Sequence, residues 1–516
     1  MKVVTVEQMR ALERRAVEAG TSEDTLMETA GLGVARAVAQ VLDGIRGRRI
    51  IVLVGAGNNG GDGMVAARYL ADWGSLVTLY MTSARRRDDK FEDCRARRVR
   101  IVEASEDAEQ WQLSSYLQLA DAVIDAMLGI GSERPLEGQL RSVIGLIQRL
   151  RGESTRPKLF AVDLPTGINA DTGACDDFCF PADITLTLGA PKAGMFRFPG
   201  ATHVGRLEIV SIGLPSGADA DVELELADSA LVRSLLPPRP IDAHKGSFGH
   251  VIVVAGSRRF IGAPVLAAAS AYRAGAGLVT LAAPESVYRL AAGQLLEQVH
   301  LPLAETSDGH IAKEAGRAVR EALAGASAAV VGPGLGDAES VRSFLQELLL
   351  ADPPQDVPIV VDADALNALA GTYGWAENLA PSAVLTPHPG EMSRLLSKSV
   401  GELETDRVAT AREAAASWRR VVVLKGAYTV VAGPDGRCTL SPFANPALAT
   451  AGTGDVLSGI IGALLAQGAP PYGAAVAGVY VHATAGERLR EEMGDAGLLA
   501  SDLLPRIPTV LQELRA

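Results

Sequence analysis

The sequence predicts an α/β protein made of two tandem domains, each with a mostly parallel sheet between layers of helices. Short apolar runs bounded by glycine, proline or aspartate alternate with stretches of helical periodicity, which is the pattern of a parallel sheet. Apolar residues make up 48% of the 516 residues and aromatic residues only 4%, while glycine occurs 54 times. Such a composition suits helices that pack closely on a sheet.

The first half of the chain opens with two predicted helices, over residues 5–20 and 26–41. Predicted strands follow, and helical periodicity lies between most of them, as over residues 63–73 and 139–150. The strands are expected at 50–54, 76–80, 122–124, 159–162, 184–188 and 207–210.

The pattern is interrupted between residues 214 and 245, where Pro215 to Gly217 and Pro237 to Pro240 break any regular element. We therefore expect a first domain over residues 1–215, a linker over 216–225 and a second domain over 226–516. From Thr453 onward the chain reads as mostly helical. The strands of the second domain are expected at 250–255, 278–282, 328–331, 359–361, 383–385 and 421–424.

Charge and composition exclude several functions. The net charge of −12 argues against a nucleic-acid binder, and the one basic cluster, residues 85–87, is followed at once by Asp88 and Asp89. Four cysteines are too few for a disulfide framework, and Cys175 and Cys179 lack partners at zinc-like spacing. The opening residues contain no apolar signal core and no run of about 20 apolar residues occurs. We expect a cytoplasmic protein without membrane partners.

Polar residues follow three strands of the first domain, in the segments 55–63, 125–131 and 163–167. The carboxyl ends of parallel strands meet at one edge of a sheet, where ligands bind. The first segment supplies two amides and a carboxylate rather than the bare glycines of a dinucleotide fingerprint. Amide, carboxylate and hydroxyl oxygens are hard ligands, so Asn59, Asp125 and Thr166 are candidates to hold a cation.

Four strands of the second domain end in the same way, in the segments 332–336, 362–367, 386–391 and 425–429. Lys425 is suited to be a counter-charge for phosphate, although a lysine without any function at a strand end would give the same sequence pattern. The prolines on either side of His388 hold it in a rigid loop. We favour a ligand contact for this histidine over a purely structural role.

The segment 451–455 opens an apolar helical run and combines two glycines, a hydroxyl and a carboxylate. Free N–H groups and the positive end of the helix dipole bind phosphate, and Gly452 and Gly454 let it approach closely. Asp455 is placed to take a proton from a substrate hydroxyl. The alternative is a glycine-rich turn in which Asp455 only caps the helix.

With these motifs in order along nearly the whole chain, the sequence resembles the bifunctional NAD(P)H-hydrate repair enzymes, which carry an epimerase domain followed by a dehydratase domain. The resemblance rests on the segments 26–31, 57–63, 125–131 and 163–167 in the first domain, and on 244–250, 332–336, 386–391, 425–426 and 451–455 in the second. It implies a Rossmann-like first domain and a ribokinase-like second domain.

The family implies a substrate, NADH or NADPH hydrated across the C5–C6 bond of the nicotinamide ring (NADHX or NADPHX). The first domain would interconvert the two C6 epimers. The second would dehydrate the S epimer with ADP, or with ATP, as phosphoryl donor and Mg²⁺ as counter-ion. Phosphorylation makes the C6 hydroxyl a good leaving group, and the ring nitrogen assists the elimination.

The resemblance also implies roles for individual residues. Asp163 would be the acid–base residue of the epimerase and Asp455 the base of the dehydratase, each in contact with substrate. K⁺ would be bound by Asn59, Asp125 and Thr166, which stands where serine is common in this family. Substrate contacts would come from Asn58, Asn59, Gly60, Gly61, Asp62, Gly129, Ile130, Gly131, Ser132, Glu133, Arg134 and Pro135, and in the second domain from Ala263, Gly334 and His388. The nucleotide would be held by Lys425, Gly426, Ala427, Tyr428, Thr429, Gly452, Thr453 and Gly454.

Two alternatives remain open from the sequence. The second domain would suit a vitamin or sugar kinase, since ribokinase-like folds share the glycine–aspartate loop. The first would suit a nucleotide-binding or protein-binding module, although such a module has little need of Asp163, Asn59 and Asp125. We also expect a homo-oligomer, with the small-residue helices after Gly459 packed between subunits.

Overall fold

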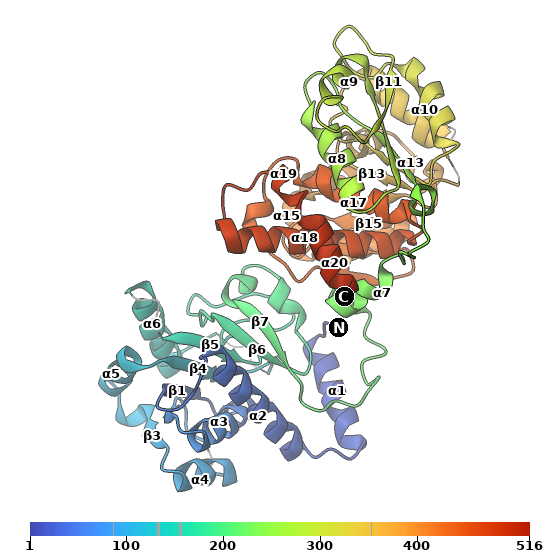
Figure 1. Ribbon diagram of the computed structural model, residues 1–516. Helices are drawn as coiled ribbons and strands as arrows, with labels where there is room; N and C mark the ends of the chain where they lie inside the picture. Colours follow the sequence, from blue (N-terminus) through green and yellow to red (C-terminus); the bar gives the residue numbers. More distant parts are fainter. Residues whose placement is uncertain (86, 132–134, 154–156, 352, 355) are drawn as a thin grey trace. The chain divides into compact units, whose positions relative to one another are not determined.

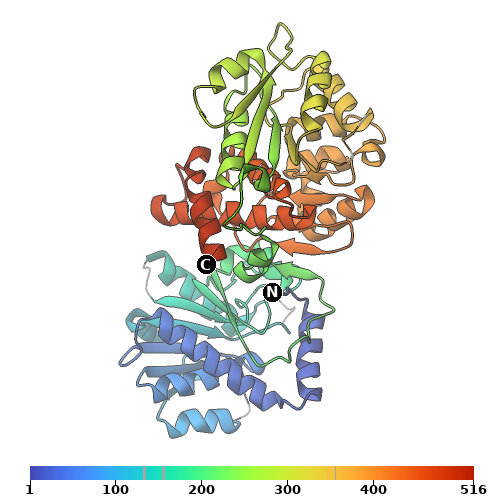
Figure 2. The ribbon, with the colours of Figure 1, turned by 45° about the vertical axis from the view of Figure 1, so that its right-hand side comes forward.

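The computed structural model describes residues 1–516 except 86, 132–134, 154–156, 352 and 355, and it contains two compact units. One unit is Lys2–Val222, and the other is Glu223–Ala516 together with Met1. Both are α/β units built on largely parallel sheets, which confirms the predicted fold class (Figures 1 and 2).

The Lys2–Val222 unit contains a seven-stranded sheet in the order β3-β2-β1-β4-β5-β6-β7, and neighbouring strands are parallel throughout. The chain runs outward from β1 in both directions, so the crevice between β1 and β4 is a topological switch point. The strands are β1 (Arg49–Val54), β2 (Leu76–Met81), β3 (Arg100–Glu103), β4 (Ala122–Ala126), β5 (Lys158–Val162), β6 (Ile184–Leu188) and β7 (Arg206–Val210).

Helices pack on both faces of this sheet, and the sheet separates the core into two clusters. Buried side chains of α1, α2, α3 and α4 pack with one set of strand residues, and those of α5 and α6 with the other. The helices are α1 (Val6–Glu18), α2 (Glu23–Val41), α3 (Asn58–Asp72), α4 (Asp89–Ala96), α5 (Trp111–Leu119) and α6 (Gly138–Glu153).

The helix after β1 begins earlier than the sequence suggests. Helical periodicity in the sequence starts at residue 63, but α3 begins at Asn58 with Gly57 as its N-cap. A β-carbon on Gly60 would lie 2.2 Å from the carbonyl oxygen of Gly55. The glycines therefore let the first turn of the helix pack directly on the end of the strand, and they do not mark a flexible loop.

The second unit contains a ten-stranded sheet in the order β11-β10-β9-β12-β13-β14-β15-β16-β17-β8. Neighbours are parallel from β11 to β15, antiparallel from β15 to β17, and parallel again between β17 and β8. The strands are β8 (Leu224–Leu226), β9 (His250–Val254), β10 (Leu278–Pro284), β11 (Val299–Leu303), β12 (Ala328–Val331), β13 (Ile359–Val361), β14 (Val384–Leu385), β15 (Val421–Leu424), β16 (Val430–Ala432) and β17 (Cys438–Leu440).

Two apolar helices, α17 (Thr453–Ala466) and α18 (Pro471–Met493), form much of the core of this unit. A β-carbon on Gly459 of α17 would lie 2.1 Å from the carbonyl oxygen of Ala267 in α8 (Gly262–Arg273), so small residues permit close helix packing here. Their burial inside the unit removes our reason for placing them between subunits, and the homo-oligomer stays a prediction. The other α-helices of the unit are α7 (Ser229–Leu235), α9 (Glu285–Ala291), α10 (Gly316–Leu323), α11 (Glu339–Gln346), α12 (Asp364–Ala370), α13 (Trp375–Asn378), α14 (Pro389–Leu396), α15 (Val400–Thr405), α16 (Arg407–Trp418), α19 (Ala500–Leu503) and α20 (Arg506–Arg515).

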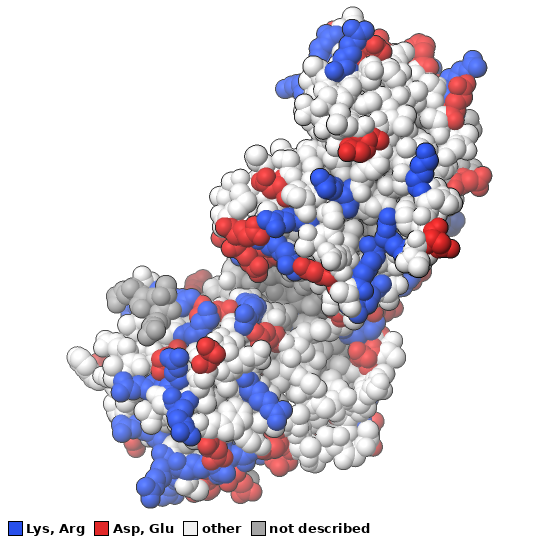
Figure 3. Space-filling view, viewed as in Figure 1, with Lys and Arg blue, Asp and Glu red and all other residues white. Residues whose placement is uncertain are grey.

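The surface carries basic and acidic side chains close together on the face that Figure 3 shows. None of the helices in the described part of the chain combines the length and the apolar character needed to cross a bilayer. All four cysteines are free thiols.

Candidate functional site

The structure brings together Asp125 and Thr166 at the carboxyl ends of β4 and β5. Asp125 is completely buried, and its carboxylate accepts hydrogen bonds from the backbone and hydroxyl of Thr166, each at 2.8 Å, and from Met127 N at 3.1 Å. The Thr166 hydroxyl accepts in turn from Leu128 N at 3.1 Å. Burial raises the pKa of Asp125 to about 6.

Asn59 reaches the same place from the first turn of α3. Its Nδ2 donates to the carbonyl oxygen of Leu128 at 2.9 Å, while its Oδ1 is buried and accepts no hydrogen bond from the described residues. A buried acceptor without a donor and a fully buried carboxylate both favour a cation nearby. The oxygen ligands fit a hard cation, and no group of three or more His, Cys, Asp or Glu side chains arranged to hold a metal occurs among the described residues.

Asp163 follows β5 directly in a left-handed conformation, with φ of 68°. Such a backbone conformation is strained in a non-glycine residue and persists only where the surrounding structure holds it. The Lys192 ammonium, which is completely buried, donates to the Asp163 carboxylate, to Thr187 Oγ1 at 3.1 Å and to the Leu188 carbonyl oxygen at 2.9 Å. Leu188 N also donates to Asp163 Oδ1 at 3.2 Å. The carboxylate is thus fixed by β6 and the loop that follows it.

We missed Lys192 from the sequence, although it follows strand β6 just as the recognised polar residues follow β1, β4 and β5. Asp62, which we did identify, is buried in the second turn of α3. Burial, followed by the charges on Asp163 and on Glu13 of α1, raises the pKa of Asp62 well above its ordinary value. Asp62 of α3 therefore lies within the electrostatic influence of Asp163 and of Glu13 at this edge of the sheet.

The other substrate contacts expected in this unit lie around the same edge. Asn58, Gly60 and Gly61 are in the first turn of α3, and a β-carbon on Gly129 would lie 3.3 Å from Cβ of Asn59. Ile130 is half-buried, whereas Gly131 and Pro135 are exposed. Ser132, Glu133 and Arg134 lie outside the described residues.

In the second unit, Lys425 at the end of β15 lies among carboxylates. Its Nζ is 2.7 Å from Asp362 Oδ1 and 3.9 Å from Glu391 Oε2. Asp362, which follows β13 and is 1% exposed, also accepts a hydrogen bond from Ser458 Oγ of α17 at 2.5 Å. Lys425 is therefore held in place by Asp362, a residue that we did not include in the predicted site.

Asp455 lies in the first turn of α17, and Gly452, with φ of 92°, is the N-cap of that helix. The N-cap of this helix is therefore Gly452, and not Asp455 as in the alternative that we considered. Burial first, and then the charge on Asp362, raises the pKa of Asp455 to about 7. A half-buried carboxyl group with a pKa near neutrality is suited to general acid–base chemistry.

His388 has a clear local role as the N-cap of α14. Its Nδ1 accepts hydrogen bonds from Gly390 N at 2.9 Å and Glu391 N at 3.4 Å, and Glu391 Oε2 accepts from His388 N at 2.7 Å. The imidazole is exposed, with Nε2 3.4 Å from Glu391 Oε1. Burial raises the pKa of Glu391 to about 7. Contact between His388 and a ligand stays a prediction.

Residues at the remaining predicted positions also lie near strand ends. A β-carbon on Gly334 would lie 3.0 Å from Cβ of Ala263, so these two candidates for substrate contact are neighbours. In the loop between β15 and β16, Thr429 Oγ1 donates to the Gly426 carbonyl oxygen at 2.8 Å. This turn also contains Ala427 and Tyr428, the latter with φ of 51°. Thr453 Oγ1 donates to the Leu448 carbonyl oxygen at 3.0 Å, while Gly454 lies beside Lys425.

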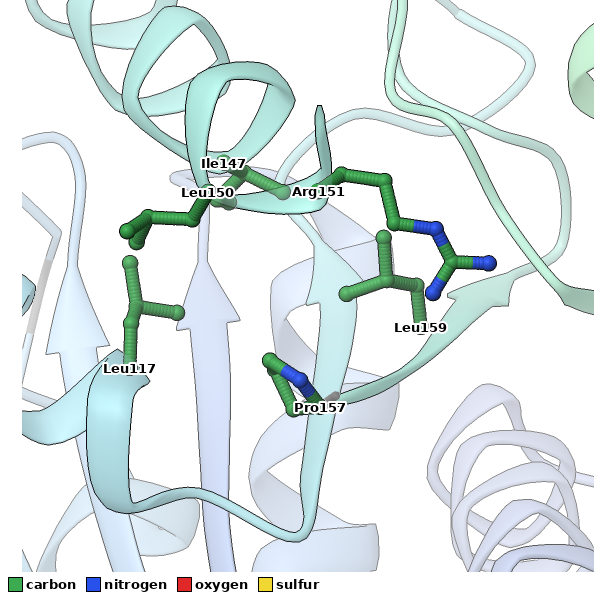
Figure 4. Close-up of a pocket in the computed structure, with 6 residues that line it drawn as sticks. All are labelled: Leu117, Ile147, Leu150, Arg151, Pro157 and Leu159. Atoms are coloured by element: carbon green, nitrogen blue, oxygen red, sulfur yellow. The ribbon is translucent and has the colours of Figure 1, made fainter. Parts of the chain in front are cut away.

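A small apolar cavity in the first unit lies apart from these groups. Figure 4 shows its lining, in which aliphatic side chains of α5, α6 and β5 surround the space together with Arg151 and Pro157. Leu159 belongs to the amino-terminal end of β5, whereas Asp163 follows the opposite end of the same strand. The cavity is therefore a packing defect remote from the candidate site.

Two family models match the chain. One, described as NAD(P)H-hydrate dehydratase, matches residues 251–509, and one described as YjeF-related protein N-terminus matches residues 23–194. Proteins named bifunctional NAD(P)H-hydrate repair enzyme Nnr from Moorella thermoacetica and Thermofilum pendens are each 39% identical over 525 residues, covering 100% of this chain and 97% of the relative. A solved ribokinase-like superfamily protein from Enterococcus faecalis has a TM-score of 0.50 and 23% identity, covering 57% of this chain and 98% of that chain, and it shows a shared fold.

Proposed function

The chain belongs to the family of bifunctional NAD(P)H-hydrate repair enzymes, and from this premise we propose that its two sites act in succession on hydrated NADH and NADPH. The Lys2–Val222 unit interconverts the R and S epimers at C6 of the hydrate. The Glu223–Ala516 unit dehydrates the S epimer and regenerates NAD(P)H. The full-length relatives weigh against a free-standing vitamin or sugar kinase.

The observation that carries the dehydratase assignment is Asp455 at the start of α17, with a pKa of about 7 and Lys425 nearby. In the proposed reaction, Asp455 accepts the proton of the C6 hydroxyl as that oxygen attacks the terminal phosphorus of the nucleotide. The C6–O bond then breaks and inorganic phosphate leaves, while the lone pair of the ring nitrogen forms a C=N bond to C6. Loss of a proton from C5 forms the C5=C6 bond and returns the electrons to nitrogen, which gives NAD(P)H. The N–H groups at the start of α17 and the Lys425 ammonium stabilise the negative charge.

We propose ADP as the phosphoryl donor, bound by the loop from Lys425 to Thr429 and by the segment from Gly452 to Gly454. The hydrate is bound by Ala263, Gly334 and His388. Mg²⁺, when bound, neutralises the phosphates. Since the described residues contain no cluster of carboxylates and histidines arranged around a metal, Mg²⁺ would be held mainly through the nucleotide phosphates.

In the epimerase site we propose that K⁺ is bound by oxygens of Asn59, Asp125 and Thr166. The unsatisfied Oδ1 of Asn59 and the buried Asp125 carboxylate support this proposal. The ion, when bound, would supply positive charge to this site. Asp163, fixed by Lys192, exchanges protons with the substrate. The segments 58–62 and 129–135 contact the hydrate.

Reciprocal substitutions test the two-site assignment. Asp455→Asn should abolish dehydration and leave epimerisation intact, whereas Asp163→Asn should do the reverse. Epimerisation is followed by chromatographic separation of the epimers, and dehydration by absorbance at 340 nm. If either substitution removed both activities from protein with a normal unfolding transition, the model of two separate sites would be wrong.

A further inference from the structure

The amino-terminal segment of the chain is attached to the lysine that holds Asp163. Val4 forms a parallel β-bridge with Lys192. Val4 N donates to the carbonyl oxygen of Pro191 at 2.9 Å, and Ala193 N donates to the carbonyl oxygen of Val4 at 2.9 Å. The backbone on both sides of Lys192 is therefore bound to the residues that lead into α1.

Helix α1 begins two residues after this bridge. Its buried residues Met9 and Leu12 belong to the same core as the side chains of β1 and β6. A β-carbon on Gly189, directly after β6, would lie 2.9 Å from Cε of Met9, and one on Gly131 would lie 3.7 Å from the Arg10 guanidinium. In Figure 2 this is the upright dark-blue helix at the right. The helix thus packs beside two of the segments that form the candidate epimerase site.

Glu13 follows Leu12 on this helix and is half-buried. The charged groups that act on it are Asp163, Lys192, Arg10 and Glu23, and its own charge acts on Asp62. Burial, followed by the charge on Asp163, raises the pKa of Glu13. The matched family segment begins at residue 23, so it does not include Glu13.

We propose that Glu13 is a second acid–base residue of the epimerase site, which works with Asp163 from a separate element. This inference rests on the proposed function of the Lys2–Val222 unit. Inversion at C6 requires that the hydroxyl leave one face of the ring and return to the other. One group must supply a proton to the leaving oxygen and another must remove a proton from the incoming one.

In the proposed step, Glu13 in its acid form gives its proton to the C6 hydroxyl. The C6–O bond breaks, water departs, and the lone pair of the ring nitrogen forms a C=N bond to C6. A water molecule then adds to the opposite face of C6 and the electrons return to nitrogen. Asp163 takes the proton from the added water. In the reverse direction the two carboxyl groups exchange roles, and the overall proton balance is zero.

The test uses the full-length protein and the purified R epimer without nucleotide, so that only epimerisation proceeds. Glu13→Gln should slow epimerisation by about 100-fold or more, the usual contribution of general acid–base catalysis. Glu18→Gln, on the exposed side of the same helix, is the matched control and should retain the wild-type rate. Dehydration of the S epimer with ADP should be unchanged in both variants.

The pH profile separates a chemical role from a structural one. Wild-type epimerisation should decline on the alkaline side as Glu13 loses its proton, and the residual activity of Glu13→Gln should lack that decline. Glu13→Asp, which retains a carboxyl group, should recover part of the rate and shift the alkaline limb. This variant decides the matter if Glu13→Gln does not fold.

A wild-type rate in Glu13→Gln, or an alkaline limb unchanged in Glu13→Asp, would overturn the inference. If the wild-type protein itself fails to interconvert the epimers while it still dehydrates the S epimer, then the proposed function of the first unit is wrong. That result is distinct from a failure of the role proposed for Glu13.

Discussion

The ammonium nitrogen of Lys425 lies 2.7 Å from Oδ1 of Asp362, at the ends of two strands that are separated in the sheet by β14. The other carboxylate oxygen of Asp362 accepts the hydroxyl proton of Ser458 in α17. One buried carboxylate therefore connects the lysine at the end of β15 to the helix that carries Asp455. Burial is the main reason that the pKa of Asp455 is raised; the charge on Asp362 raises it further, and the Lys425 ammonium lowers it.

Dehydration should depend on pH through Asp455. As a base this residue must be unprotonated, so kcat/KM should fall tenfold per pH unit below about pH 7. Asp362→Asn removes a negative charge near Asp455 and leaves the positive charge of Lys425 without its partner. Both changes lower the pKa of Asp455. The acid limb should move down by about one pH unit. An unchanged limb in this variant would contradict the role given to Asp362.

Asp455 should reduce the stability of the folded protein at neutral and alkaline pH. Its pKa is about 7 in the folded state, against 3.8 ordinarily, so between these values the folded state retains a proton that the unfolded chain has lost. The free energy of unfolding therefore falls as pH rises through this window. Asp455→Asn should raise the free energy of unfolding, measured by urea denaturation, by on the order of 4 kcal/mol at pH 8 and change it little at pH 4. Equal gains at both pH values would argue against the raised pKa.

Lys425 should contribute both to the stability of the folded protein and to nucleotide binding, and two variants should distinguish these contributions. Lys425→Met leaves Asp362 as a buried charge without its cation, which costs about 3 kcal/mol. Combining Lys425→Met with Asp362→Asn should restore much of that stability, because the uncompensated charge is gone. Neither variant should bind ADP with wild-type affinity in calorimetry. Wild-type affinity in the double variant would show that Lys425 does not contact the nucleotide.

Epimerisation should require K⁺. In a buffer whose only monovalent cation is tetramethylammonium, its rate should drop by about 10-fold or more and recover on addition of K⁺. Asn59→Ala removes the unsatisfied Oδ1 and should weaken the response to K⁺. Dehydration in the same protein provides the control. If K⁺ had no effect on the wild-type epimerase, the cation assignment of Asn59, Asp125 and Thr166 would fail.

Sequence patterns were sufficient to predict the two α/β units and most strands of the parallel sheets, because buried parallel strands are short apolar runs between polar loops. They also placed Asp125 and Asp163 at one edge, since each directly follows such a run. The strands β3, β8, β11, β16 and β17 were not predicted. Their sequences, such as Cys438–Leu440 and Val299–Leu303, are too brief or too interrupted to stand out from loops.

The residues that we missed are those whose roles depend on tertiary contacts. Lys192 lies 29 residues beyond Asp163, and only the closure of β6 against β5 brings them together. Asp362 stands 63 residues before Lys425, and nothing in its own segment distinguishes it from Asp364. Glu13 belongs to a helix that the sequence places before the sheet. The bridge between Val4 and Lys192 attaches the start of this helix to the lysine that binds Asp163.

The most direct measurement is the recovery of absorbance at 340 nm from a mixture of R and S NADPH hydrate, with ADP, Mg²⁺ and K⁺ present. The account predicts complete recovery, because the first unit converts the R epimer as the second consumes the S epimer. Recovery that stopped at the initial fraction of S epimer would contradict the epimerase assignment. No recovery with ADP, nor in a parallel reaction with ATP in its place, would contradict the dehydratase assignment and with it the central claim.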